Sequence, residues 1–267
     1  MAAILGPDLL PFCGFPGSKV AAPSHGAALT APGQGASGHD GALTLARMAV
    51  VVVANMVVRV LGAGDRRKLD PADDSLFYAA PRYVHHLDAA FRSRLTGLYR
   101  ERIAPGAVVL DLMGSWVSHL PEEIRYGSVI GHGLNAAELQ ANPRLSRFWV
   151  QNLNVDQILP LEPDSVDAIL ITAGWQYLQY PEAIAAELLR ILRPGGLLIV
   201  AFSNRMFAQK APQVWLEGSD QDHLQLVAKV LVAQGWPEPE RLAEATRTPG
   251  PMGCLLYTSP SPRDQRG

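Results

Sequence analysis

The chain has 267 residues, of which 48% are hydrophobic and 18% are charged, and its formal net charge is −2 at pH 7. This balance is typical of a globular protein with one sizeable core, and it excludes a disordered chain and a multi-span membrane protein. It also excludes a general nucleic-acid-binding protein, which normally carries a basic face, because no run of Lys and Arg is interleaved with aromatic residues.

Residues 1–64 are expected to form a low-complexity segment ahead of the folded domain. Residues 1–46 are rich in Ala, Gly and Pro, and such a composition cannot bury enough apolar surface to fold alone. We therefore expect that deleting residues 1–64 leaves the melting temperature nearly unchanged.

The apolar run at residues 48–58 is shorter than the ~20 residues of a membrane span, so no stable span is expected. The run fits the hydrophobic part of a targeting signal, an apolar core helix, or a second start site at Met48. A targeting role would place the protein in a plastid; without one, a cytoplasmic location is expected.

From residue 65 onward, apolar strands alternate with helices, the first of them at residues 88–103. The predicted strands are residues 108–112, 128–131, 147–151, 166–172 and 197–202. Strands that are apolar throughout and separated by helices indicate a parallel sheet covered on both faces. Right-handed crossovers then predict an α/β domain with a doubly wound, mostly parallel sheet, a Rossmann-like fold of three α/β/α layers.

Capping residues mark the boundaries of the predicted helices. Asn135 and Glu138 have the spacing of a capping box at the start of a short helix. The helix at residues 181–192 is expected to stop at RPGG, residues 193–196, where glycine supplies the cap. A last helix is expected at residues 222–234.

The domain is expected to span residues 65–252, and residues 253–267 are expected to be a non-native tail without function. The phrase YTSPSPRD in this tail resembles translated library-adaptor sequence. Only residues 254–258 are apolar enough for a final strand, and prolines stop them at once. We expect these residues to form at most a makeshift strand at the edge of the sheet.

Three segments in this order resemble the class I methyltransferases of type 11, which use S-adenosylmethionine. VVLDL at residues 108–112 is followed by DSVDAIL at residues 164–170 and by LRPGGLLIVAF at residues 192–202. The phrases FYAAPRYVHHLD, LDLMGSWVSHLP and AFSNRMF are also similar to an uncharacterised subgroup of photosynthetic organisms. The resemblance covers roughly residues 104–236 and implies methyl transfer from S-adenosylmethionine as cofactor.

The resemblance implies that cofactor-binding residues follow the first three strands. Asp111 ends strand one, where a carboxylate suits the ammonium group of the methionine moiety, and Gly114 keeps the following turn close. Ser115 is expected to offer its hydroxyl to the cofactor's carboxylate or merely to cap a turn. After strand three, Asn152 and Leu153 match the position that contacts adenine, with an amide oxygen replacing the family's acid.

Two positions depart from the family pattern. Trp116 replaces a glycine, and it is expected either to narrow the pocket or, as the favoured role, to pack under the loop. The acid that holds the ribose hydroxyls falls on Gly133, which has no side chain, so Asn135 is expected either to bind the ribose or only to cap a helix. The alternative function is therefore a methyltransferase-like binding protein with weak or no turnover. An NAD-dependent oxidoreductase is set aside because the Gly-x-Gly-x-x-Gly turn is absent.

The acceptor is expected to bind between the loop after strand four and the segment before strand one. Methyl transfer needs in-line positioning, plus a base where the acceptor loses a proton. Tyr177 and Gln176 are candidates to orient the acceptor, and Trp175 to wall the pocket. His86 or its neighbour His85 is a candidate base, unless it is a surface residue near a helix start.

The partner is expected to be a small or lipidic acceptor and no nucleic acid, because a basic face is absent and the loop around residues 175–177 is apolar. Asn204 and Arg205, after strand five, would suit an anionic acceptor. No metal is expected, because Cys13 and Cys254 lie near opposite ends of the chain. The sequence predicts no oligomeric state.

Overall fold

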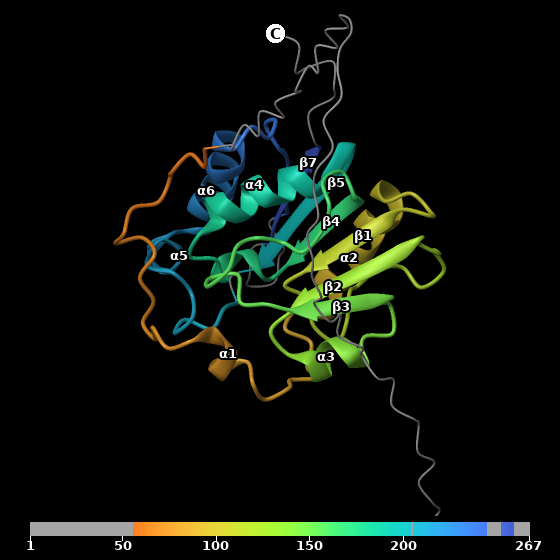
Figure 1. Cartoon of the computed structure of the whole chain (residues 1–267), viewed down its shortest axis with the longest axis horizontal. Helices are drawn as coiled ribbons and strands as arrows, with labels where there is room; N and C mark the ends of the chain where they lie inside the picture. The colour runs from red at the N-terminus through yellow and green to blue at the C-terminus, as the bar shows by residue number, and fades with distance from the viewer. Residues whose placement is uncertain (1–55, 204, 245–251, 259–267) are drawn as a thin grey trace, which may run out of the picture. The chain divides into compact units, whose positions relative to one another are not determined.

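The computed structural model describes residues 56–203, 205–244 and 252–258 (Figure 1). Most of the expected N-terminal segment, Asn204 and the last nine residues of the expected tail lie outside these ranges, and so does most of the apolar run at residues 48–58. Within the described part of the chain, no helix is long and apolar enough to cross a bilayer.

The domain is built on a seven-stranded sheet with the order β3-β2-β1-β4-β5-β7-β6. The strands are β1 (Val108–Leu112), β2 (Ser128–Gly133), β3 (Arg147–Val150), β4 (Val166–Thr172), β5 (Leu192–Ser203), β6 (Glu240–Glu244) and β7 (Met252–Thr258). Strands β1 to β5 pair in parallel, whereas β7 runs antiparallel to both β5 and β6. The predicted doubly wound, mostly parallel sheet is confirmed.

Helices cover both faces of this sheet. They are α1 (Asp74–Phe77), α2 (Ala89–Arg102), α3 (Ala136–Ala141), α4 (Pro181–Ile191), α5 (Gln213–Glu217) and α6 (Asp220–Ala233), with a 3-10 turn η1 (Trp175–Tyr177). Along β4, Ile169 and Ile171 pack with α4 and α6, while Ala168 and Leu170 pack with α2. Because alternate strand residues point to opposite faces, this pattern gives the expected three layers.

The predicted helix–strand boundary before β5 is corrected by a few residues. α4 ends at Ile191, and β5 begins at Leu192 rather than at residue 197. Gly195 takes the left-handed φ of +78° expected of the glycine pair, but it does so within the strand. Leu192 already pairs with Val166 of β4, and this early pairing extends the strand through the glycines.

The C-terminal strand differs from the expected makeshift edge. β7 lies between β5 and β6, and it pairs with β5 from Met252 to Thr258. The edge position belongs instead to β6, in a proline-rich stretch where no strand was expected. The prediction failed because it judged residues 254–258 without the preceding strand, which supplies a second partner.

A segment at residues 65–87, called the cover segment below, precedes α2 and contains α1 (orange in Figure 1). It pairs with the chain after β5 through a bridge between Lys68 and Pro212. Just before it, Val60 and Leu61 donate backbone hydrogen bonds to the buried carboxylate of Glu182 in α4, at 2.9 and 2.7 Å. Residues ahead of the expected boundary at residue 65 thus contact the domain, and Leu61 is 4% exposed.

Candidate active site

A cavity of about 390 Å³ lies at the carboxyl ends of β1 to β5, and the cover segment supplies one of its walls. The strand order reverses between β1 and β4, because the chain first builds outward to β3 and then returns to the other side of β1. Open α/β sheets bind their ligands outside such a reversal, where two neighbouring loops diverge. The cavity therefore lies where the fold favours a binding site.

The structure brings eight of the predicted site residues to this cavity. They are Asp111, Gly114, Ser115, Asn135, Asn152, Leu153, His86 and Tyr177. These residues come from the loops after four strands and from the cover segment, so only the folded sheet places them together. Their chemical roles stay predictions, and the contacts described next bear on each of them.

Asp111 presents an unsatisfied carboxyl oxygen in a buried position. The residue is 3% exposed, and its Oδ2 makes no hydrogen bond to any described residue. Burial raises the pKa of Asp111 to about 7, against a smaller opposing effect of a hydrogen bond from Ser118. A Cβ on Gly114 would lie 2.9 Å from the Asp111 Cγ, so glycine is required for the turn to close over the carboxyl group.

Three residues of the cavity wall adopt a strained backbone. Met113, His119 and Ala173 have φ values of +59°, +55° and +54°, in the left-handed region that favours glycine. Each of them contributes to the lining of the cavity. Strained non-glycine residues cluster at sites where the backbone must present groups to a ligand, so this clustering supports a functional site.

Gly133 cannot carry the acid that the family pattern places there. A Cβ at this position would lie 2.5 Å from the backbone oxygen of Gly114, which is closer than side-chain carbons approach other atoms. The Gly114 amide in turn donates to His132 O at 2.7 Å, which fixes the turn against β2. The turn after β1 therefore occupies the space that a side chain at residue 133 would need.

Asn135 is engaged at both ends of its amide. Its Oδ1 accepts from the Glu138 amide at 3.1 Å, so it is the N-cap of α3. Its Nδ2 donates to the carbonyl oxygens of Tyr78 and Ala79 in the cover segment, at 2.9 and 3.0 Å. Of the two roles expected for Asn135, the structure shows the capping role.

Glu138 does not complete the expected capping box. Its Oε1 accepts from the backbone amide of Arg82 at 2.6 Å, and its Oε2 accepts from the Ser115 hydroxyl at 2.6 Å. The carboxylate thus turns away from the Asn135 backbone and into the cavity wall. The sequence spacing predicted a helix cap and gave no sign of this contact.

Asn152 and Leu153 differ in what they present. The Asn152 Oδ1 accepts from the amide of Asn154 at 3.0 Å, and its Nδ2 donates to Asp73 of the cover segment at 2.9 Å. Leu153 is 3% exposed and belongs to the hydrophobic core under the cavity. Asn152 therefore shapes the loop after β3 while lining the cavity.

His132 is a cavity residue that the sequence analysis did not identify. Its Nδ1 accepts from the Met113 amide at 3.1 Å, so Nε2 carries the proton and donates to Gln151 O at 2.9 Å. Burial lowers the pKa of His132 to about 4, and the ring is therefore neutral at physiological pH. It joins the loops after β1 and β3, which is a positioning role.

The two catalytic candidates meet at Phe207. The Tyr177 hydroxyl accepts from the Phe207 amide at 3.0 Å, and the two rings stack with a centroid distance of 6.2 Å. The His86 ring packs edge-to-face on Phe207 at 5.7 Å. Burial lowers the pKa of His86 and raises that of Tyr177, so at neutral pH the imidazole can accept a proton and the phenol can donate a hydrogen bond.

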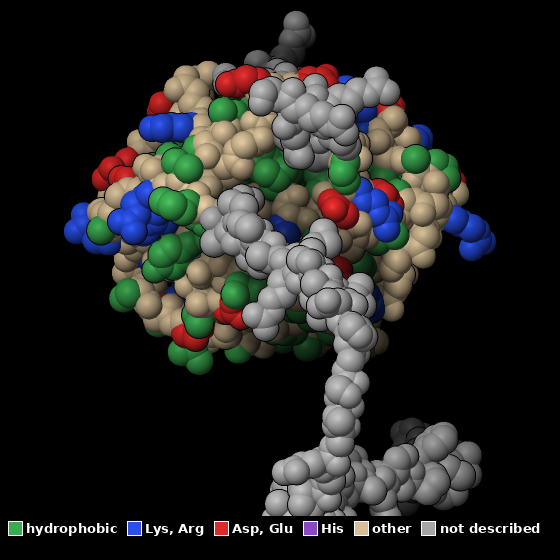
Figure 2. Space-filling view, turned by 45° about the horizontal axis from the view of Figure 1, so that its top comes forward, with side chains coloured by type: hydrophobic (Ala, Val, Ile, Leu, Met, Phe, Trp, Pro, Cys, Tyr) green, Lys and Arg blue, Asp and Glu red, His purple; other side chains and the backbone are tan. Residues whose placement is uncertain are grey.

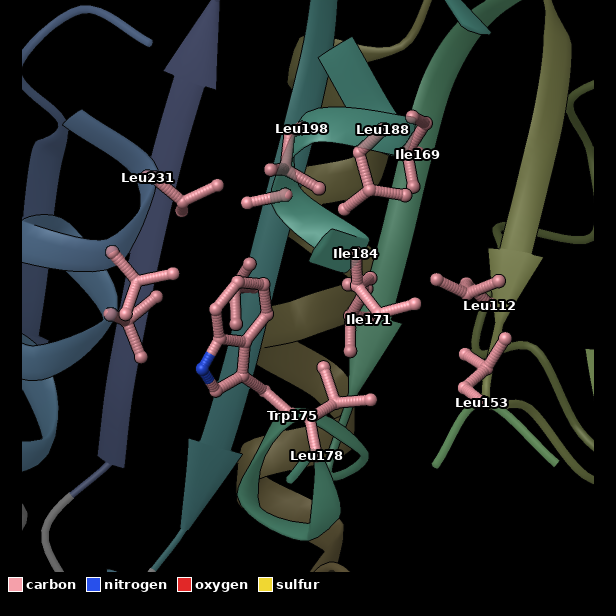
Figure 3. Close-up of a cluster of buried hydrophobic side chains, with 14 of the residues drawn as sticks. Leu112, Leu153, Ile169, Ile171, Trp175, Leu178, Ile184, Leu188, Leu198 and Leu231 are labelled. Atoms are coloured by element: carbon pink, nitrogen blue, oxygen red, sulfur yellow. The ribbon is translucent and has the colours of Figure 1, made fainter. Parts of the chain in front are cut away.

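Two expectations about tryptophans and one about Gln176 have clear outcomes. Trp175 does not wall the pocket, because its ring lies among aliphatic core side chains such as Ile171 and Ile184 (Figure 3). Trp116 lines the cavity, as expected of a residue that narrows the pocket, and its Nε1 donates to Val84 O of the cover segment at 3.2 Å. Gln176 does line the cavity, and its buried Oε1 makes no hydrogen bond to a described residue.

Cations also line the acceptor side of the cavity. The Arg82 guanidinium lies over the rings of Phe77, Tyr78 and Phe207, and its buried Nη1 makes no hydrogen bond to a described residue. Arg205 is an exposed part of the wall. Both positions suit an acceptor with a negative group, as the sequence suggested for Arg205.

A buried charge cluster holds the cover segment over the cavity. Lys68 Nζ lies 2.7 Å from Asp74 Oδ2, and Lys210 Nζ lies 3.5 Å from Asp74 Oδ1 and 2.8 Å from Asp70. Asn154 donates to the same Asp74 carboxylate at 2.8 Å. Burial lowers the pKa of Lys68 despite these partners. The cluster ties α1 to the chain after β5 and to the loop after β3.

Residues 114–200, about a third of the chain, match the type 11 family described as a methyltransferase domain. The match begins at Gly114 and ends in β5, so it contains the turn after β1 and the loops after β2, β3 and β4. The likeness to a photosynthetic subgroup stays a prediction. A comparison with curated proteins gave no match.

A comparison with solved structures gave several similar chains. The [4+2]-cyclase SpnF is 15% identical, with a TM-score of 0.50 over 63% of this chain and 80% of its own. Phosphoethanolamine N-methyltransferase 2 of Haemonchus contortus, in complex with S-adenosyl-L-methionine, is 12% identical, with a TM-score of 0.48 over 64% and 53%. A methyltransferase of Methanosarcina mazei is 13% identical, with a TM-score of 0.42 over 61% and 97%. Such low identities show the fold alone.

Proposed function

We propose that this protein transfers a methyl group from S-adenosylmethionine to a small or lipidic acceptor. The observation that carries the proposal is the buried, unsatisfied Oδ2 of Asp111 within the matched fold. A buried carboxyl oxygen without a partner is costly, and an ammonium group supplied by a ligand would satisfy it. The cofactor carries such a group on its methionine moiety, so the residues present fit it.

The remaining residues of the site divide into a cofactor side and an acceptor side. Gly114 and Leu153 let the ligand approach the backbone after β1 and β3, where no large polar side chain intervenes. Ser115 and Asn152 keep acceptor lone pairs for the ligand, although both already make hydrogen bonds within the protein. When bound, the cofactor supplies an electrophilic methyl group, and the protein has to position the acceptor against it.

On the acceptor side, we assign His86 and Tyr177 to proton transfer and orientation. His86 is neutral at physiological pH because burial lowers its pKa, so it can take a proton from an acceptor that must lose one. The Tyr177 hydroxyl accepts from the Phe207 amide and keeps its own proton to donate to the acceptor. Both side chains lie at Phe207, which gives the acceptor an apolar wall.

Two observations support a small or lipidic acceptor. On the face shown in Figure 2, the Lys and Arg side chains of described residues are scattered among Asp and Glu rather than gathered into a basic patch. Exposed apolar side chains instead occur on the cover segment and after β3, both of which border the cavity. They are Leu69, Leu76, Tyr83, Val84, Val155 and Ile158. A lipid or apolar small molecule could enter past such residues without a charged partner.

The second candidate is a methyltransferase-like binding protein with weak or no turnover. It is favoured by the blocked space at Gly133 and by the engaged amide of Asn135, which leave the expected ribose contacts unmade. It is also compatible with the fold likeness to a protein named as a cyclase, because one fold serves several chemistries.

Methyl transfer can be tested with methyl-tritiated S-adenosylmethionine. The protein is incubated with a cell extract that has been separated into small molecules and lipids, RNA, and protein. We expect label in the organic-soluble or small-molecule fraction, and none with Asp111→Asn. Label in RNA or protein would contradict the acceptor class, and cofactor binding without label in any fraction would favour the second candidate.

A further inference from the structure

We propose that Glu138 is the carboxylate that binds the ribose hydroxyls of the cofactor, in place of the acid that residue 133 cannot carry. This inference rests on the proposed function and names a residue of its site. Sites that bind adenosine cofactors at a sheet edge use an acid near the end of the second strand, because ribose hydroxyls donate well to a charged oxygen. In this chain that acid has to come from elsewhere.

The position at the end of β2 is closed for a steric reason. The backbone oxygen of Gly114 lies 2.5 Å from where the Cβ of residue 133 would be, and backbone does not yield as a flexible side chain would. The tight turn that brings Gly114 against Asp111 is thus the cause of the missing acid. A compensating carboxylate must enter the cavity from a neighbouring element.

Glu138 enters the cavity from the first turn of α3, directly after β2. It is the third residue after the N-cap Asn135, where a carboxylate normally folds back onto the helix start. Here the carboxylate instead accepts from Ser115 in the turn after β1, at 2.6 Å. It therefore lies between the two loops that flank the blocked position at Gly133.

The other acidic side chains of the described cavity wall are committed elsewhere. Asp74 lies in the buried charge cluster with Lys68 and Lys210. Asp111 lies at the end of β1, and its raised pKa reflects a site without a charged partner. Glu138 is the remaining carboxylate among the lining residues. A carboxylate has about four lone pairs, so two hydrogen bonds within the protein leave room for two ribose hydroxyls.

The same carboxylate is held in place by the cover segment. The amide of Arg82 donates to Oε1 of Glu138 at 2.6 Å. A few residues earlier in the cover segment, the carbonyl oxygens of Tyr78 and Ala79 accept hydrogen bonds from Asn135. Glu138 is therefore oriented before any ligand arrives, which lowers the entropic cost of binding. Glu138 also joins the ribose position to the cover segment, so a change of Glu138 should alter both ribose binding and the hydrogen bond of the Arg82 amide.

The test measures binding of S-adenosylhomocysteine and of its 2′,3′-dideoxy analogue by calorimetry. The wild-type protein is expected to bind the ribose form about 10- to 100-fold more tightly, the range of hydrogen bonds to a charged group. Glu138→Gln should lose most of this preference while it binds the dideoxy analogue as the wild type does. Glu122→Gln, an exposed change away from the cavity wall, is the matched control and should keep the preference.

A second readout uses the protein without ligand. Glu138→Gln is expected to raise hydrogen exchange at the amide of Arg82, because the charged acceptor of this amide is lost. If Glu138→Gln does not fold, Glu138→Asp keeps the charge but withdraws it by one methylene, and the same loss of preference is expected. An unchanged preference in the folded variant overturns the inference. Failure of the wild type to bind S-adenosylhomocysteine at all would instead overturn the proposed function on which it rests.

Discussion

Asp111, Gly114 and Gly133 form a chain of steric dependence at the centre of the site. The Asp111 carboxyl group needs a residue without Cβ at position 114, and the backbone of Gly114 then needs a residue without Cβ at position 133. One buried carboxyl group thus dictates two glycines that lie 19 residues apart in sequence, on neighbouring strands. Gly114 stands outside any Gly-x-Gly pattern, and both glycines are required by close contacts with the protein's own side chain and backbone.

Asp111 should give the stability of the ligand-free protein a distinctive pH dependence. Burial raises its pKa from about 3.8 to about 7, so between these values the folded protein holds a proton that the unfolded chain releases. Its contribution to the free energy of unfolding is therefore largest below pH 4 and is lost as the pH rises toward 7. The loss is about 1.4 kcal/mol per pH unit and at most about 4 kcal/mol.

Asp111→Asn removes this titration while it keeps the size of the side chain. Urea unfolding of both proteins between pH 4 and pH 8 should show the variant gaining stability relative to the wild type as the pH rises. A constant difference across this range would show that the Asp111 carboxyl group is ionised in the folded protein at low pH, contrary to its buried position.

Restoring the family's acid at residue 133 should harm the protein. Gly133→Asp would push a side chain into the backbone oxygen of Gly114 and displace the turn over Asp111. We expect a loss of about 1–3 kcal/mol in the free energy of unfolding and weaker binding of S-adenosylhomocysteine. Tighter binding by the variant would show that the turn can move aside and that the space is available.

At this scale, sequence reasoning identified which residues face the cavity but not what they touch. A strand followed by Asp111 and Gly114 predicts a site at the sheet edge, because parallel strands end together. Spacing alone cannot tell whether the Glu138 side chain folds back onto Asn135 or reaches Ser115, because both positions are within its length. His132 stood outside any motif, and Phe207 ended the phrase AFSNRMF without an assigned role, so only the structure could show their contacts.

The cover segment forms one wall of the cavity. Its position is set by buried ions rather than by a hydrophobic face, since α1 has only four residues and its buried member is Asp74. Buried ion pairs are costly when one partner is removed, because the remaining charge keeps its desolvation penalty. The segment should therefore be sensitive to changes in single lysines.

Lys210→Met tests this dependence. Lys210 is 1% exposed, and its loss leaves the Asp74 carboxylate with Lys68 as its remaining cationic partner. We expect the free energy of unfolding to fall by about 3 kcal/mol in urea titration. Glu123→Gln, which breaks the exposed pair with Arg100, is the control and should leave stability nearly unchanged. Equal effects of the two changes would contradict the role of the buried cluster.

The strands of the parallel core were predictable, and the elements at the sheet's end were not. The predicted bounds are confirmed for β1 (Val108–Leu112) and β4 (Val166–Thr172). A short run that is apolar throughout is typical of a strand buried on both faces of a parallel sheet. β6 carries no such signal, and β7 carries only the short apolar run at residues 254–258. β7 pairs with both β5 and β6, and β6 pairs with β7. Pairing partners distant in sequence leave no local pattern.

For the whole molecule, the boundary of the folded domain decides which truncations are tolerated. Removing residues 1–55 should leave the melting temperature nearly unchanged, because the composition of residues 1–46 does not support a core and the described hydrogen bonds with the domain begin at Val58. Removing residues 1–64 should lower it, which revises the expectation from sequence. The longer deletion takes away Leu61 and two amide donors to the buried Glu182 carboxylate, a loss of about 1–3 kcal/mol.

Thermal unfolding of the two truncated proteins, compared at one concentration, checks this boundary. If both truncated proteins have the melting temperature of the full chain, the contacts of Val60 and Leu61 with α4 contribute nothing to stability. If the shorter deletion already lowers the melting temperature, residues 1–55 must include part of the core.

Titration calorimetry with S-adenosylhomocysteine at pH 8 measures whether the cavity binds the cofactor through Asp111. This product analogue keeps the ammonium group but cannot be turned over. We predict one site per chain in the wild type and a loss of about 1.5–3 kcal/mol of binding free energy in Asp111→Asn. No binding to the wild type, or equal affinity of the folded variant, would contradict the claim.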